Sequence, residues 1–81
     1  MEFSKVIGSI QYLLDDNTTP RTVRERLTRM IGYLKKDGED DQRKISTVLS
    51  ELEDLSSDVN IPPYVRTQLY GISSQLEALN S

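Results

Sequence analysis

The chain contains no cysteine and no histidine among its 81 residues. The lack of cysteine excludes disulfides, thiolate nucleophiles, iron–sulfur ligation and the usual structural zinc sites, and it is compatible with a reducing cytosol. The lack of histidine leaves no side chain with an ordinary pKa near neutrality, so acid–base catalysis would need a strongly shifted carboxylate or lysine. We therefore expect a cytoplasmic protein that is not an enzyme and needs no cofactor.

Long apolar runs are also missing. The longest are two or three residues, such as Tyr12-Leu13-Leu14, and the N-terminus lacks the basic and apolar regions of a signal peptide. We expect neither a membrane span nor a signal peptide. The net charge of −3 argues against general binding to nucleic acid or anionic membranes.

The charges are unevenly distributed along the chain. Residues 20–36 contain six basic side chains and one acidic one, whereas residues 37–58 contain eight acidic side chains and two basic ones. This distribution predicts a dipolar molecule, with local fields that the small net charge conceals.

An internal repeat with a period of 42 residues runs through the sequence. Nine identical pairs align without a gap: Ser4/Ser46, Val6/Val48, Leu13/Leu55, Asp16/Asp58, Pro20/Pro62, Val23/Val65, Arg24/Arg66, Leu27/Leu69 and Leu34/Leu76. The period lies within the roughly 40 to 47 residues typical of HEAT or armadillo repeats. We predict one domain over residues 1–81, with repeat units at 1–39 and 43–81.

Each repeat unit predicts two amphipathic helices, because apolar residues recur at spacings of three and four. The four apolar stripes are Phe3, Val6, Ile7, Ile10, Leu13 and Leu14; Val23, Leu27, Met30, Ile31 and Leu34; Ile45, Val48, Leu49, Leu52 and Leu55; and Val65, Leu69, Ile72, Leu76 and Leu79. Each stripe spans about 100°, which suits a helix with a single buried side. The sequence therefore predicts an all-α four-helix bundle, built from two tandem HEAT-like helix-turn-helix hairpins, rather than an open superhelix.

The turns within the two hairpins have the same chemistry. The predicted structural turn residues are Asp16, Pro20 and Arg24 in the first hairpin and Asp58, Pro62 and Arg66 in the second. Thr18 and Asn60 are the expected N-caps of the following helices, and proline suits a first helical turn.

Arg24 and Arg66 are each predicted to lie about a quarter turn from the apolar stripe and to reach back to an acceptor such as Asp16 or Asp58. A second role, anion binding at a helix start, remains open.

The segment from Lys35 to Asp41 should join the two hairpins. It places lysines in a last helical turn, Gly38 just beyond it and acids at the next helix start, an order that the helix dipole and left-handed C-caps favour.

The spacing Asp16-x-x-x-Pro20-x-x-Val23-Arg24, repeated from Asp58 to Arg66, resembles the turn of HEAT repeats, where an aspartate precedes a valine–arginine pair. It departs from that pattern because the aspartate lies eight residues before the arginine and the proline expected in the first helix is missing. Over its whole length the chain more closely resembles a small family of uncharacterised archaeal proteins with the same doubled Asp, Pro and Arg pattern. The resemblance implies a compact helical bundle and brings no activity, substrate or cofactor.

Adjacent acids at 15–16, 40–41 and 53–54 could in principle bind Mg²⁺ or Ca²⁺. Neighbouring residues on a helix point in different directions, however, and no EF-hand spacing is present. We predict no metal site.

Two surfaces are candidates for binding a partner. Arg21, Arg29 and Lys36 should share the side of the second helix opposite its apolar stripe, where they could meet phosphates or form a solvated face. Tyr12 and Tyr70 fall off their stripes and should face outward, either as interface residues or as isolated surface aromatics.

Gly8, Gly32 and Gly71 lie inside predicted helices, where each costs roughly 1 kcal/mol relative to alanine. Close approach of another helix, within the chain or between copies, would account for them.

Three function classes remain open from the sequence. The first is a small protein-interaction module or scaffold, which binds a protein partner or associates with itself. The second is weak nucleic-acid binding, specifically of RNA, through the basic second helix, and the third is an enzyme with an unconventional carboxylate or tyrosine site. We predict the first, with no membrane association.

Overall fold

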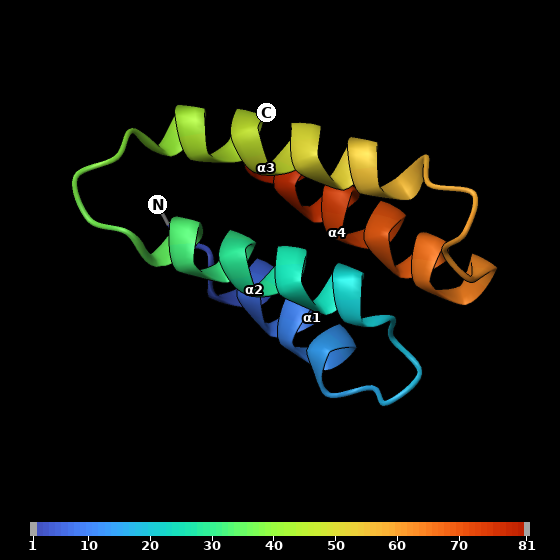
Figure 1. The fold of residues 1–81 in the computed structure, drawn as a ribbon. Coiled ribbons are helices and arrows are strands. Elements are labelled where there is room, and N and C mark those ends of the chain that lie inside the picture. Colours follow the sequence, from blue (N-terminus) through green and yellow to red (C-terminus); the bar gives the residue numbers. More distant parts are fainter. Residues whose placement is uncertain (1, 81) are drawn as a thin grey trace.

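The computed structural model describes residues 2–80, which form four α-helices and no strand. The helices are α1 (Ser4–Leu14), α2 (Arg21–Lys35), α3 (Asp41–Ser56) and α4 (Pro63–Asn80). Each helix packs on two others, in the order α1, α2, α3, α4 and back to α1, so the contacts form a closed ring. Figure 1 shows the two hairpins side by side, with both hairpin turns at one end of the bundle and the α2–α3 loop at the other. The predicted all-α four-helix bundle is confirmed.

The core lies along the axis of the bundle and consists of the four predicted stripes. Sixteen of the stripe residues are buried, and Ile7, Leu14, Ile31, Leu49 and Leu79 pack against them at the edges. Each helix thus presents a single apolar side to its neighbours, as the stripe width indicated. The sequence analysis missed Ile61, which is buried in the second turn, and Tyr33, which packs at the edge of the core.

The N-cap prediction for Thr18 and Asn60 is wrong. Both residues lie within the turns, where their backbone N–H groups donate to the carboxylates of Asp16 and Asp58, each at 2.9 Å. The helices begin later: Pro20 is the N-cap of α2, and α4 begins at Pro63. Pro20 is extended, with φ −58° and ψ 149°. The aspartates satisfy turn amides two residues on, an alternative to capping that short acidic side chains favour.

Arg24 and Arg66 reach back to their turns as predicted, and their acceptors are backbone carbonyls; Arg66 reaches the predicted Asp58, whereas Arg24 reaches Asn17 and Thr19 in place of Asp16. Arg24 donates to Thr19 O at 3.0 Å and Asn17 O at 3.2 Å. Arg66 donates to the carbonyls of Ser56 and Asp58, both at 2.9 Å. The carbonyls at the end of a helix and in the following turn have no intrahelical donor, so a guanidinium with several N–H groups can satisfy two at once.

The junction between the hairpins contains a buried lysine that the sequence analysis did not single out. Lys44, near the start of α3, donates from its ammonium to Leu34 O at 3.0 Å and to the carbonyl of Lys36. Its ammonium also lies 5.8 Å from the centre of the Phe3 ring. Gly38 has the expected positive φ, 84°, but α2 ends in an extended C-cap at Lys36. Lys44 therefore satisfies the last carbonyls of α2 in place of a left-handed C-cap.

Close approach of a helix within the chain, one of the two explanations left open for the helical glycines, does not account for them. A methyl group added at Gly8, Gly32 or Gly71 would have no neighbour within 4 Å. All three face open space, so no contact within the chain requires a glycine at these positions.

Candidate binding surfaces

Charge is divided sharply between the helices. Only Lys5 is charged among the 11 residues of α1, and only Arg66 and Glu77 among the 18 of α4. In contrast, α2 contains six charged residues among 15 and α3 six among 16. Because α1 and α4 are neighbours in the ring, the molecule has one charge-poor side and one charge-rich side.

We call the charge-poor side the α1–α4 face. Lys5, Gly8, Ser9 and Tyr12 from α1 and Gln68 from α4 border one recess on this face. Tyr64, Gly71 and Gln75 follow the spacing of three and four residues from Gln68 and so lie on the same side of α4. A hydrogen bond of 3.1 Å from Ser9 Oγ to Gln75 Oε1 joins the two helices across it. A shallow recess of about 360 Å³ lies beside Gly8 and Tyr12. A second recess, of about 210 Å³, is lined by the apolar residues Val6, Ala78 and Leu79 and by Glu2, Lys5 and Gln75. This face therefore combines low charge, small side chains and shallow hollows.

Tyrosines mark the turn end of the α1–α4 face. Tyr12 is 64% exposed and Tyr64 is 44% exposed. The pKa of the Tyr64 hydroxyl is raised, chiefly by the Asp16 carboxylate and to a lesser extent by Tyr12. The pKa of Asp16 itself is lowered, chiefly because its carboxylate accepts the backbone N–H of Thr18. The sequence analysis missed Tyr64, although its place one position beyond the proline pair is that of an exposed residue in a first helical turn.

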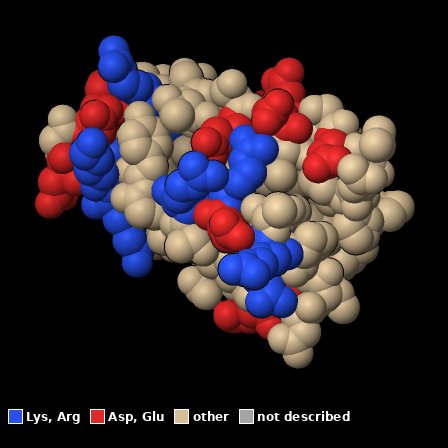
Figure 2. Space-filling view, in the orientation of Figure 1, with Lys and Arg blue, Asp and Glu red and all other residues tan. Residues whose placement is uncertain are grey.

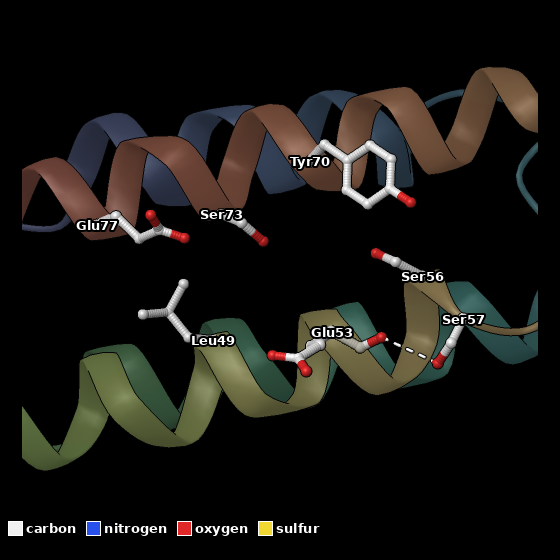
Figure 3. A pocket seen from close by; sticks show the side chains of 7 residues that line it. All are labelled: Leu49, Glu53, Ser56, Ser57, Tyr70, Ser73 and Glu77. Carbon is white, nitrogen blue, oxygen red and sulfur yellow. Dashed lines mark hydrogen bonds between the residues drawn. The ribbon is translucent and has the colours of Figure 1, made fainter.

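The other predicted tyrosine, Tyr70, is 55% exposed but lies elsewhere. It borders an open groove of about 460 Å³ between α3 and α4, which we call the α3–α4 groove. The groove is lined by Leu49, Glu53, Ser56, Ser57, Tyr70, Ser73 and Glu77. Figure 3 shows side chains entering it from both helices, with Tyr70 toward one end and Glu77 toward the other. The structure therefore separates Tyr12 and Tyr70, which the sequence analysis grouped together.

The predicted basic residues Arg21, Arg29 and Lys36 are exposed, but acidic side chains lie among them. Arg21 pairs with Glu25 at 3.4 Å, and Lys36 lies 3.9 Å from Glu39. Arg29 borders a small recess that also contains Tyr33 and Glu51. Figure 2 shows this side of the molecule, where basic and acidic side chains alternate rather than form a continuous positive band.

Two further findings concern possible ligands and membranes. Within residues 2–80, no three acidic side chains gather closely enough to hold a metal ion. No helix in the same range is long and apolar enough to cross a membrane.

Comparison with known proteins places the chain. Residues 1–79 match the family described as Uncharacterised protein family (UPF0147). The chain belongs to this family. The UPF0147 protein of Methanothermobacter thermautotrophicus is 34% identical over 77 residues, which cover 95% of this chain and 76% of that relative. UPF0147 protein Ta0600 of Thermoplasma acidophilum is 37% identical over 79 residues, which cover 93% of this chain and 90% of that relative.

Solved structures agree with the fold. A crystal structure of a UPF0147 protein from Thermoplasma acidophilum superposes with a TM-score of 0.90 at 36% identity and covers 95% of this chain and 91% of that one. The crystal structure of the unknown function protein MMP1188 gives a TM-score of 0.84 at 28% identity, over 93% of this chain and 85% of that one. The resemblance to an uncharacterised archaeal family is thus confirmed, and the HEAT-like character of the hairpins stays a prediction.

Proposed function

We propose that this UPF0147 protein acts in the cytoplasm by binding protein rather than by catalysis, and that its α1–α4 face binds a second copy of the chain. The observation that carries the proposal is the uneven charge of the helices. Protein interfaces are depleted of charge at their centres and enriched in tyrosine, as is this face with Tyr12 and Tyr64.

Self-association suits the charge of this face. A two-fold dimer brings the same surface of each copy together, so like charges on it would repel one another. Among residues 2–80, Lys5 and Glu2 are the charged side chains that border the two recesses of the α1–α4 face, and the other acidic residues that give the chain its net charge of −3 lie mainly on α3 and the loops. Two copies can therefore meet here with little repulsion.

The size of the face limits the interface that a dimer can form. The Cα atoms extend over 33 × 21 × 17 Å, so a long side of the bundle covers about 560 to 700 Å², below the roughly 800 Å² that each partner contributes to a standard interface. Open glycines at positions 8 and 71 allow another helix to approach the backbone closely. A weak dimer, with a Kd in the range of about 10 to 100 μM, is the expected outcome.

The glycines provide a matched set of variants for the test. Gly8→Arg and Gly71→Arg each add a charge to the α1–α4 face, and Gly32→Arg adds the same charge on α2. All three sites are open, and arginine has a higher helix propensity than glycine, so all three variants should fold. Sedimentation velocity from about 5 to 500 μM should show dimers of the wild type and of Gly32→Arg. Gly8→Arg and Gly71→Arg should raise the dimer Kd by at least about tenfold.

Two results would overturn this assignment. A wild-type chain that stays monomeric over the whole concentration range has no self-association for the face to mediate. Equal weakening by Gly32→Arg would assign the effect to net charge rather than to the face.

The alternative function, RNA binding through Arg21, Arg29 and Lys36, has one supporting observation: the Arg21 side chain is 93% exposed. The acids beside Arg21 and Lys36 weaken the local positive field. Fluorescence anisotropy with generic RNA and duplex DNA at low salt separates the two functions, because phosphate binding must weaken steeply as salt rises.

We also propose that the two hairpins are HEAT-like. The support for this proposal is the equivalent placement of Arg24 and Arg66, each of which donates to two backbone carbonyls at the preceding helix end or turn, although the accepting positions differ between the repeats.

A further inference from the structure

The α3–α4 groove has a composition that the proposed self-association does not use. Leu49 offers an apolar wall from α3, and the Tyr70 ring lies on the opposite helix. Glu53 and Glu77 contribute a carboxylate from each side, and both are exposed. An aromatic ring, an aliphatic side chain and two acids thus border one hollow.

Neither carboxylate has a partner among the described residues. Glu25, Glu39 and Asp54 each lie within 4 Å of a basic side chain. Among residues 2–80, neither Glu53 nor Glu77 has an ion pair or a side-chain hydrogen bond. Their negative charge is therefore available to a cation from outside.

The acidic surface extends beyond the groove along α3. Ser56 and Ser57 border the groove where α3 ends, and Arg66 already donates to the carbonyl of Ser56 there, so the acidic side chains rather than the helix end supply the negative potential. A second hollow continues from the groove over α3, since Leu49, Glu53 and Ser57 border both, and it reaches Asp54. The acidic surface is thus long enough for several residues of an extended peptide.

From these observations we infer that the α3–α4 groove binds an arginine side chain from a basic segment of a partner protein. A guanidinium stacks on an aromatic ring, forms bidentate hydrogen bonds with carboxylates and packs its aliphatic stem on apolar side chains. Tyr70 supplies the ring, and Glu53 and Leu49 supply a carboxylate and an apolar wall from α3. Glu77, at the other end of the groove from Tyr70, supplies a carboxylate for a further basic residue of the same segment.

The groove is separate from the α1–α4 face. Tyr64 and Tyr70 are six residues apart on α4 and therefore project about 120° apart, toward α1 and α3 respectively. A partner peptide and a second copy of the chain could bind at the same time, so the two assignments can fail independently.

The test uses a fluorescein-labelled peptide of three Ala-Arg repeats, and the same peptide with citrulline in place of arginine. Citrulline keeps the shape of the side chain and removes its charge. At protein concentrations up to about 1 mM and low salt, the arginine peptide should bind with a Kd of about 0.1 to 0.5 mM, and the citrulline peptide at least about tenfold more weakly.

Matched variants locate the site. Glu53→Gln and Glu77→Gln should each weaken binding of the arginine peptide about fivefold, and Tyr70→Leu about threefold. Glu51→Gln makes the same charge change on the α2 side of α3, and Tyr12→Leu removes a tyrosine from the other face. Both controls should change the Kd by less than about twofold.

The assignment is overturned if the citrulline peptide binds as well as the arginine peptide, or if Glu51→Gln weakens binding as much as Glu53→Gln. The first result would mean that charge recognition is absent, and the second that any acidic residue suffices. Sedimentation of the same variants reports on self-association separately, because none of the three groove residues lies on the α1–α4 face.

Discussion

The two hairpins have an equivalent arginine near the start of their second helix, but the residue buried inside the turn before that helix differs. In the first turn Thr19 is buried, and its hydroxyl donates to Leu13 O at 2.8 Å. At the equivalent place in the second turn Ile61 is buried and has no side-chain donor. Both turns keep the arginine that donates to their backbone carbonyls. The residue buried inside the turn, in contrast, can be polar or apolar.

The starts of the two repeat units differ more. Position 44 in the second unit corresponds to position 2 in the first, where Glu2 accepts the backbone N–H of Ser4 at 2.9 Å. Lys44 instead satisfies the end of the preceding helix, α2. Within the described residues α1 has no preceding helix, so a cation at position 2 would have no carbonyls to bind.

The largest loss of stability should come from replacing Lys44, which connects α3 to the end of α2. Lys44→Met keeps an unbranched side chain over Phe3 but leaves the carbonyls of Leu34 and Lys36 without their donor. We expect the free energy of unfolding to fall by about 2 to 3 kcal/mol, measured by urea denaturation. Lys35→Met, at an exposed position of α2, is the control and should change it by less than about 0.5 kcal/mol. A small loss at Lys44 would mean that water replaces the ammonium without cost.

The turn arginines should follow. Arg24→Ala and Arg66→Ala each remove two hydrogen bonds to carbonyls, at a cost of about 1.5 to 2 kcal/mol in thermal or urea unfolding. Arg21→Ala, at an exposed surface ion pair, should cost less than about 0.5 kcal/mol. If Arg24→Ala and Arg66→Ala both leave the melting temperature unchanged, the structural role of the turn arginines is wrong.

Substituting the buried residue of each turn should have a moderate effect on the free energy of unfolding. Thr19→Val removes the donor to Leu13 O, and Ile61→Thr places a hydroxyl where the Leu55 carbonyl is the equivalent acceptor. Each change should cost about 1 kcal/mol. If Thr19→Val proves neutral while Ile61→Thr costs more than about 3 kcal/mol, the two interiors are not interchangeable and the comparison of the turns fails.

The smallest effect concerns pH. The pKa of Asp16 is lowered from 3.8 because the carboxylate accepts hydrogen bonds from Thr18. A lowered pKa in the folded state stabilises the protein above the unfolded pKa, and this contribution is lost as the pH falls through the folded value. Asp16→Asn keeps an acceptor oxygen and removes the charge. It should lower stability slightly at pH 7, and the difference from wild type should vanish at acid pH; a difference independent of pH would contradict this.

The sequence predicted the core because burial depends on periodicity. All 21 stripe residues, from Phe3 to Leu79, lie in or against the core, since each helix buries one side only. Ile61 escaped this reasoning because it lies in a turn, where no helical period applies. Lys44 escaped it because a buried cation depends on where the carbonyls of another helix end.

The candidate surfaces were harder to predict. Periodicity placed Tyr12 and Tyr70 on the outside but could not say which neighbouring helix each would approach. The charge-poor nature of α1 and α4 is visible in the sequence, yet it becomes a face only when the first and last helices are neighbours.

This adjacency of α1 and α4 makes the order of the hairpins along the chain interchangeable. Because the ring of helix contacts is closed, a circularly permuted chain that ran α3, α4, α1, α2 would find the same neighbours for every helix. Such a chain would be opened between Lys36 and Asp40, and Lys44 could still reach the end of α2 across the break. In the permuted protein Lys44 would connect the new N-terminus, before α3, to the new C-terminus, after α2. Substitution of Lys44 should therefore fray both ends.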